Sequence, residues 1–448
     1  MKTLTLRDAD VRVLTRPGSV ERVYVVVTMF LLAYSLPNEW FTEAVPAFID
    51  PQAAAATNAS QGPLPTLVFG GLFAFALLQM TGNTHVVARL LRRERLLPLF
   101  VSMAVLSTLW AVDPGITGRR SVAFALTTAF GYYLAMRFDV NEIIRYAGLA
   151  LALGTILNVA WIEVLPQYGV TPDIASFGDD VGAWKGIFPQ KNSLGIYSVL
   201  AVLTFLILAR SHRRFRTFYY PLALVNVWLV LGSQSKTSLV SAAGLAVMLV
   251  VYLAFRARKT LFGAVAVTMT TVTIGSTLIV TLQLREIAEL LGRDVTLTGR
   301  TALWESLIPE IMNRPWLGVG WSGYWNGWDS PSHEILVEHA WLPPHAHSAM
   351  LDYALQLGII GAGLFLALFV RSVIRATRHI QFDRSAIGLW PLAFLSFTLM
   401  FSVTESGFLG RNLPWALFVV AVATVTNDTR QSLIERVTSG LARPAPPD

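Results

Sequence analysis

Apolar segments long enough to cross a lipid bilayer recur along the whole chain. A helix of roughly 20 apolar residues spans the hydrocarbon core, and about twelve segments of nearly that length can be drawn. They are 20–40, 64–82, 96–112, 121–136, 146–165, 193–209, 218–234, 238–255, 260–282, 353–370, 386–403 and 413–426. Because helices satisfy their backbone hydrogen bonds internally, the pattern predicts an all-α polytopic membrane protein with about 12 transmembrane helices.

The composition supports this class and excludes others. Hydrophobic residues make up 54% of the 448 residues and charged residues only 14%, whereas soluble domains carry about 25% charged residues. The same numbers exclude intrinsic disorder. The chain has no cysteine, which excludes disulfides, thiolate nucleophiles and Cys-ligated metals. The net charge of +7 would suggest nucleic acid as a partner of a soluble protein, but here it bears on membrane sidedness.

Basic residues divide the loops into two alternating sets. Most of the 35 lysines and arginines lie in one set, which the positive-inside rule places in the cytoplasm together with both termini. The prediction is a cytoplasmic N-terminal segment 1–19, membrane helices within 20–282 and 353–426, an outer loop 283–352 that we expect to be functional, and a cytoplasmic tail 427–448. The first apolar run lacks a cleavage site and is expected to be a retained helix.

The outer loop begins with a predicted amphipathic helix. Apolar residues recur at helical spacing after Arg300, and Pro315 ends the run. We expect this helix to lie on the outer membrane surface; the alternative is a helix packed against the bundle. Arg300 stands at its N-terminus, where free backbone N–H groups attract anions.

The end of the same loop is rich in histidine. His333, His339, His345 and His347 are four of the seven histidines in the chain. A histidine here can act as a general base near neutral pH, or it can simply be hydrogen-bonded at a helix start. A zinc site formed by His345 and His347 with Glu334, Glu338 or Asp352 is a further alternative, although the HExxH spacing is absent.

Several cations lie on the outer face, where membrane insertion disfavours them. They are Arg119, Arg120, Lys185, Lys191, Lys236, Arg285, Arg293, Arg300, Arg314 and Arg411. Binding an anion is the simplest reason to retain some of them, and pairing with acidic side chains is the alternative. Lys236 lies in GSQSKTS, which is not a phosphate loop because Ser235 replaces the required glycine.

These motifs together resemble the bacterial O-antigen ligase and exopolysaccharide polymerase superfamily. The main similarity is His347-Ser348, followed after nine residues by Gly358, Gly361 and Gly363, glycines that we expect to let membrane helices pack closely. Further similarities are Trp110-Ala-Val-Asp113-Pro114 with Arg119-Arg120, Phe188-Pro-Gln-Lys191-Asn192, Gly299-Arg300, and Glu405.

The resemblance implies a membrane glycosyltransferase of the GT-C type that works at the periplasmic face of the bacterial inner membrane. Its donor would be an undecaprenyl-diphosphate-linked oligosaccharide, with no cofactor and no metal. His347, Arg300 and Lys236 would be the catalytic residues, with Lys236 at a position where the family has arginine. The diphosphate or glycan would be bound by Arg119, Arg120, Lys191, Asn192, His345 and Glu405.

The acceptor separates two versions of this activity. A polymerase joins one lipid-linked repeat unit to another, whereas a ligase transfers the glycan to lipid A–core. The loop series GRTALW, RPWLGVGW and YWNGW is more similar to the polymerases. A flippase or transporter is the alternative from another class, and it predicts ionisable residues at mid-membrane. The expected partners are the bilayer, the acceptor glycan and chain-length or export proteins, with no nucleic acid.

Overall fold

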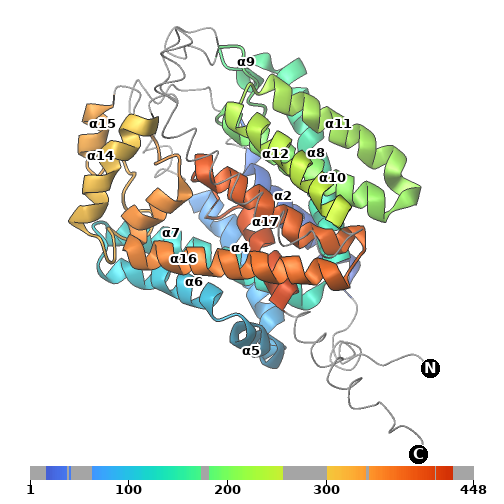
Figure 1. Ribbon diagram of the computed structural model, residues 1–448, viewed down its shortest axis with the longest axis horizontal. Coiled ribbons are helices and arrows are strands. Elements are labelled where there is room, and N and C mark those ends of the chain that lie inside the picture. The colour runs from blue at the N-terminus through green and yellow to red at the C-terminus, as the bar shows by residue number, and fades with distance from the viewer. Residues whose placement is uncertain are drawn as a thin grey trace, which may run out of the picture.

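The computed structural model describes residues 17–37, 40–41, 63–172, 181–255, 300–339, 343–408 and 410–426. Their regular structure is helical, apart from one isolated antiparallel bridge between Val170 and Trp184. The α-helices, shown in Figure 1, are α2 (Ser19–Tyr34), α4 (Pro63–Thr81), α5 (Thr84–Arg93), α6 (Leu96–Leu106), α7 (Pro114–Arg137), α8 (Val140–Val164), α9 (Pro166–Gly169), α10 (Lys191–Ser211), α11 (Arg216–Gly232), α12 (Lys236–Phe255), α14 (Arg300–Asn313), α15 (His333–Glu338), α16 (Ala349–Phe382) and α17 (Ala386–Thr404), followed by the apolar helix Leu413–Thr426.

Each predicted membrane segment that falls on described residues is largely occupied by a helix. The predicted segment 260–282 lies outside the described residues. Among the described residues, four stretches are long and apolar enough to cross a membrane: Leu64–Thr81, Val140–Val164, Lys191–Ser211 and Ala349–Gln381. Shorter apolar helices are Leu96–Leu109, Lys236–Leu249, Ala386–Ser402 and Leu413–Thr426. The chain is therefore a helical multi-pass membrane protein, while the total of about twelve spans stays a prediction.

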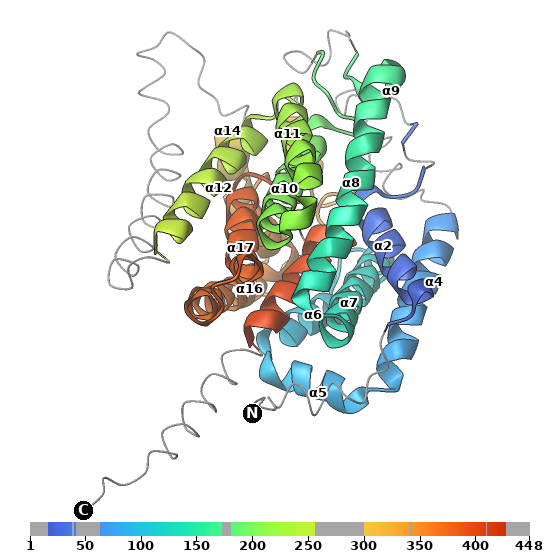
Figure 2. The ribbon, with the colours of Figure 1, turned by 90° about the vertical axis from the view of Figure 1, so that its right-hand side faces the viewer.

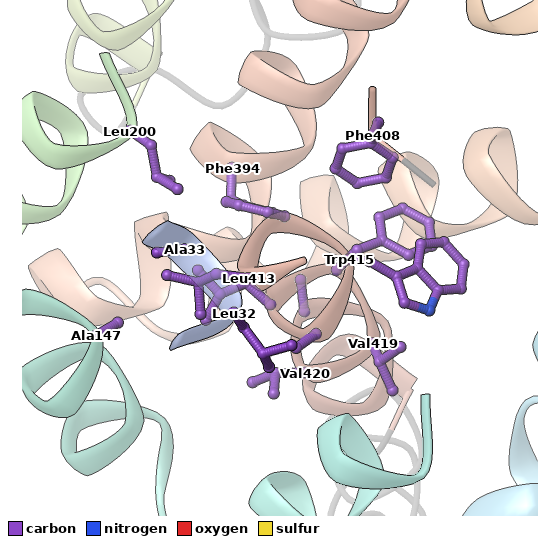
Figure 3. Packing of buried hydrophobic residues seen from close by; sticks show 14 of the residues in the cluster. Leu32, Ala33, Ala147, Leu200, Phe394, Phe408, Leu413, Trp415, Val419 and Val420 are labelled. Carbon is purple, nitrogen blue, oxygen red and sulfur yellow. The ribbon is translucent and has the colours of Figure 1, made fainter. Parts of the chain in front are cut away.

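The apolar helix Leu413–Thr426 occupies the core of the bundle. Leu413, Trp415, Val419 and Val420 are fully buried, as expected of a helix that is hydrophobic on every side. Figure 3 shows these residues among side chains from α2, α8, α10 and α17. The protein, and not lipid, therefore surrounds this last helix.

Two ion-pair clusters join helices at the predicted cytoplasmic side. Glu21 of α2 accepts hydrogen bonds from Arg137 (2.6 Å) and Tyr133 (2.8 Å) of α7. Glu94, between α5 and α6, contacts Arg371 and Arg375 of α16. These buried carboxylates have cationic partners, which is how a low-dielectric interior tolerates a charge.

Two of the glycines after His347, Gly358 and Gly363, do not serve helix packing as expected. Gly358 interrupts α16 with a φ of +67°, and a Cβ atom there would lie 2.2 Å from the Trp316 backbone. The Ile359 N–H donates to the Pro315 carbonyl (2.7 Å) instead of continuing the helix. A Cβ atom at Gly363, in contrast, would have no heavy atom within 4 Å. The expectation was therefore wrong at Gly358, because an inserted loop and a left-handed residue require that glycine.

Helix α14 forms where the sequence predicts it, but its apolar face is divided. Leu303 and Leu307 are fully buried, whereas Ile308 and Met312 are 56% and 61% exposed. Figure 1 shows α14 beside α15, and α14 also packs against α16. One side of the helix thus packs on the protein, while another side exposes apolar side chains. Contact of this exposed side with the membrane surface stays a prediction.

Candidate functional site

Glu405, immediately after α17, is the centre of a buried polar cluster. Its Oε1 atom accepts hydrogen bonds from Arg300 Nη2 and Asn192 Nδ2, both at 3.1 Å. Its Oε2 atom lies 3.3 Å from His347 Nδ1 and 3.6 Å from His345 Nε2. We call Asn192, Arg300, His345, His347 and Glu405 the Glu405 cluster. Residues from distant parts of the chain therefore meet at a single carboxylate that is 4% exposed.

Hydrogen bonds extend the cluster to the start of α12. Asn192 Oδ1 accepts from the Ser235 hydroxyl (2.8 Å), which in turn accepts from the Ser238 hydroxyl (2.9 Å). A Cβ atom on Gly195 would lie 2.3 Å from Ser238 Oγ. The absence of a side chain at Gly195 lets α10 and α12 approach closely enough for this network.

Four helices begin at the Glu405 cluster. They are α10 at Lys191, α12 at Lys236, α14 at Arg300 and α16 at Ala349, two residues after His347. Helix N-termini carry a partial positive charge and unpaired N–H groups, whereas α17 contributes its C-terminal end. The backbone and the Arg300 guanidinium together make this region suited to an anion.

His347 has an unusual backbone conformation. Its φ is +49°, in the left-handed region, and Gln234, just before Ser235, has a φ of +51°. Non-glycine residues adopt this region infrequently, and such strain is concentrated at functional sites. Both residues lie just before helices that begin at the Glu405 cluster.

Burial determines the charge state of the histidines. Burial lowers the pKa of His345 to about 3, aided by His347 and Arg300 and opposed by Glu405. Burial and then Arg300 lower the pKa of His347 to about 3. Burial also raises the pKa of Glu405, while His345 and Arg300 oppose that shift. At neutral pH both imidazoles are neutral, so each retains a nitrogen lone pair.

The cluster also has ligand types that metals use. One ligand atom from each of His345, His347 and Glu405 lies within 4.8 Å of the others, and two imidazoles with a carboxylate suit zinc. However, Arg300 binds the same carboxylate at 3.1 Å. Arg300 binds Oε1, whereas both imidazoles face Oε2, so a metal ion held by these three side chains would lie next to a guanidinium.

The structure places the remaining predicted residues around or away from the cluster. Lys236 is exposed at the start of α12, next to Ser235, and Lys191 is half-buried beside Asn192. Arg119 is exposed. Arg120 donates to Ser322 O (3.1 Å) and Asn326 Oδ1 (2.9 Å), which ties α7 to the outer loop.

The other two loop histidines lie outside the cluster, and two further residues were unexpected. His333 contacts the Trp328 carbonyl, and His339 lies 3.2 Å from Ser306 Oγ, so neither belongs to the cluster.

The sequence motifs indicated no role for Ser235, and they suggested Asp352 only as a metal ligand. A serine before a helix and an aspartate in its first turns are common caps, so neither carried a distinguishing signal.

Comparison with known proteins identifies a related family and a relative. A family model described as O-antigen ligase matches residues 221–366, which include Lys236, Arg300 and His347 but not Glu405. The exopolysaccharide production protein ExoQ of Rhizobium meliloti (strain 1021) is 26% identical over 289 residues. The match covers 60% of this chain and 62% of that relative.

Proposed function

We propose, because the chain resembles the bacterial O-antigen ligase and exopolysaccharide polymerase superfamily, that it is a membrane glycosyltransferase. It transfers a glycan from undecaprenyl diphosphate to an acceptor hydroxyl at the outer face of the inner membrane. The observation that carries the proposal is the meeting of four helix N-termini with Arg300 and two neutral imidazoles.

A lipid-linked diphosphate fits this site chemically. Outside the cytoplasm nucleotide sugars are scarce, so the donor must bring its own activated leaving group. Diphosphate leaves as a stable anion and needs cations rather than a proton donor. Arg300 and the helix N-termini supply positive charge inside the site, while Lys236 and Lys191 lie at its edge.

His347 is the proposed general base. The acceptor oxygen attacks the anomeric carbon, the bond from that carbon to the diphosphate oxygen breaks, and the leaving diphosphate keeps the electron pair. The acceptor proton passes to His347. An imidazole with a pKa of about 3 is a weak base, but a bound diphosphate would raise that pKa because an anion favours the imidazolium form. Donor binding therefore prepares the base, and a single displacement inverts the anomeric centre.

Glu405 is proposed to orient these groups. It holds Arg300 through Oε1 and faces His347 Nδ1 through Oε2. A carboxylate beside one ring nitrogen leaves the other nitrogen to accept a proton, as in other histidine–carboxylate pairs. Asn192 fixes the carboxylate from α10, so the Glu405 cluster is arranged before substrate binds.

The outer-face location is part of the proposal. α9 and α5 lie at opposite ends of the bundle in Figures 1 and 2, and the loop charges assign them to opposite sides of the membrane. Trp184, in the loop after α9, donates to Gly232 O, three residues before Ser235 (2.9 Å). The Glu405 cluster therefore lies toward the α9 end.

Sidedness can be measured directly because the chain has no cysteine. Single cysteines at the exposed positions Glu338 and Arg213 are labelled in intact cells with a membrane-impermeant maleimide. We expect labelling of Glu338→Cys alone before lysis and of both variants afterwards. Labelling of Arg213→Cys alone before lysis would invert the proposed topology.

Polymerisation of exopolysaccharide or O-antigen repeats is the version that we favour, supported by the similarity to ExoQ. Ligation to lipid A–core is the second candidate, because the matched family model carries that description. Purified protein in liposomes receives lipid-linked repeats with or without lipid A–core. Chain growth on repeats alone supports the polymerase, whereas transfer that requires lipid A–core supports the ligase.

Two matched pairs of variants test the site. His347→Ala and Arg300→Ala should each lower the transfer rate at least about 10²-fold. His333→Ala, an exposed histidine outside the cluster, and Arg314→Ala, an exposed arginine at the other end of α14, should retain activity. EDTA should leave wild-type transfer unchanged. Full transfer by both His347→Ala and Arg300→Ala would overturn the proposed mechanism.

A further inference from the structure

Asp352 is a buried carboxyl group that none of the proposed chemical steps uses. It lies in the first turns of α16 and is 2% exposed. Its Oδ1 atom accepts hydrogen bonds from Trp325 Nε1 (2.7 Å) and from the backbone N–H of Ala346 (3.3 Å). Ala346 stands between His345 and His347, so Asp352 contacts the peptide that joins the two imidazole-bearing residues.

The Ala346 backbone is held from both sides. Its N–H donates to Asp352, and its carbonyl oxygen accepts from Trp304 Nε1 of α14 (2.7 Å). Ala346 itself is fully buried. Two side chains from different helices therefore replace the regular secondary structure that would normally fix this backbone.

The hydrogen bonds that hold Ala346 lie directly before His347, the residue with the left-handed backbone. His347 has a φ of +49°, and its N–H donates to His345 Nδ1 (3.2 Å). A conformation of this kind persists only where the surroundings hold it. The Asp352 carboxyl group also interacts with Ser406, the neighbour of Glu405. Asp352 thus connects the turn that carries the histidines with the segment that carries the carboxylate they face.

We propose that Asp352 is a positioning residue that fixes the backbone from His345 to His347 and thereby sets the His347 ring against Glu405. It does not touch the reacting atoms. The inference rests on the proposed transferase function for its kinetic consequence, whereas its structural consequence can be measured without any substrate.

The kinetic test compares two substitutions of similar size. Asp352→Leu removes the acceptor, while Asp352→Asn retains an oxygen for the Ala346 and Trp325 N–H groups. In liposomes with lipid-linked repeats, we expect Asp352→Leu to lower kcat about 10²-fold, because small misplacements of a catalytic group cost that much. The donor KM of Asp352→Leu should change less than about threefold, since Arg300 is untouched. The kcat of Asp352→Asn should be at least about tenfold higher than that of Asp352→Leu.

A matched pair controls for the loss of any buried carboxylate. Glu21→Leu and Glu21→Gln alter a buried, hydrogen-bonded carboxylate between α2 and α7. They should affect thermal stability in detergent without the selective loss of kcat. In a His347→Ala background, Asp352→Leu should have little further effect on the residual rate, because it acts through His347.

The substrate-free measurement uses the ¹⁵N NMR signals of labelled histidines. Asp352→Leu should shift the signals of His345 and His347, assigned by their own substitutions, while Glu21→Leu should not. Unchanged signals, or an unchanged kcat in an active enzyme, would overturn the positioning role. Shifted signals in a protein whose wild type transfers no glycan would instead overturn the proposed function and leave the positioning role standing.

Discussion

Arg300 Nη2 lies 3.1 Å from Glu405 Oε1, joining residues 105 positions apart in the sequence. Both side chains are largely buried, at 14% and 5% exposure. Removing one partner of a buried ion pair leaves an uncompensated charge. We propose that the pair keeps an arginine in the buried site until an anionic substrate can share it.

Glu405→Gln should affect both stability and transfer. The substitution preserves size but leaves Arg300 without its counter-ion, a change that typically costs about 3–5 kcal/mol for a buried pair. We expect a lower melting temperature in detergent and at least about a 10²-fold lower transfer rate. Glu305→Gln, on the exposed face of α14, is the control. A Glu405→Gln protein with wild-type rate and stability would contradict the role assigned to this carboxylate.

The stability of the protein should depend on the two buried histidines at acidic pH. Burial lowers the pKa of His345 and His347 to about 3 in the folded protein, from an ordinary value of about 6.5. Between these values the unfolded chain binds more protons, so the free energy of unfolding decreases as pH falls from about 6.5 toward 3.

Thermal unfolding across this pH range checks the sign. The double substitution His345→Asn with His347→Asn should lose less stability on acidification than the wild type, whereas His333→Asn, at an exposed position, should behave like the wild type. An identical pH dependence in wild type and double variant would show that these imidazoles are not buried as neutral groups.

Lys236 should contribute mainly to donor binding. It is exposed at the start of α12, one residue from Ser235 of the hydrogen-bond network. Lys236→Ala should raise the donor KM about tenfold, equivalent to about 1.4 kcal/mol, with a smaller change in kcat. Lys236→Arg should bind the donor at least as well, because guanidinium can engage phosphate with two N–H groups. Arg213→Ala, at the opposite side of the membrane in our topology, serves as the control. A donor KM unaffected by Lys236→Ala would exclude Lys236 from the site.

Gly358→Ala should strongly destabilise the protein. The left-handed backbone costs a non-glycine residue about 1–3 kcal/mol, and the new Cβ atom would lie 2.2 Å from Trp316 backbone atoms. Gly363→Ala is a matched control on the same helix, because no heavy atom lies within 4 Å of the Cβ position there. We expect a lower melting temperature for Gly358→Ala alone; equal stability of the two variants would mean that the loop 314–320 can move away from α16.

The helical membrane class and many groups of the candidate site could be predicted from the amino-acid sequence. Apolar segments of bilayer length have few other solutions, since backbone polar groups must be satisfied within the lipid. Arg300 could be placed at a helix start because N-terminal signals are local in sequence. The family resemblance identified His347 and Glu405, whose chemical roles remain predictions.

Which helix ends meet became apparent in the folded structure alone. Asn192 and Glu405 are 213 residues apart and yet share a hydrogen bond, while His333 and His339, close to His347 in sequence, face other partners. The role proposed for Asp352 could not be predicted from the sequence either, since it depends on the hydrogen bonds that Ala346 and Trp325 donate to its carboxyl group. Helix spacing and caps are encoded within a few residues, but the meeting of distant helix ends arises from packing of the whole bundle around its buried last helix.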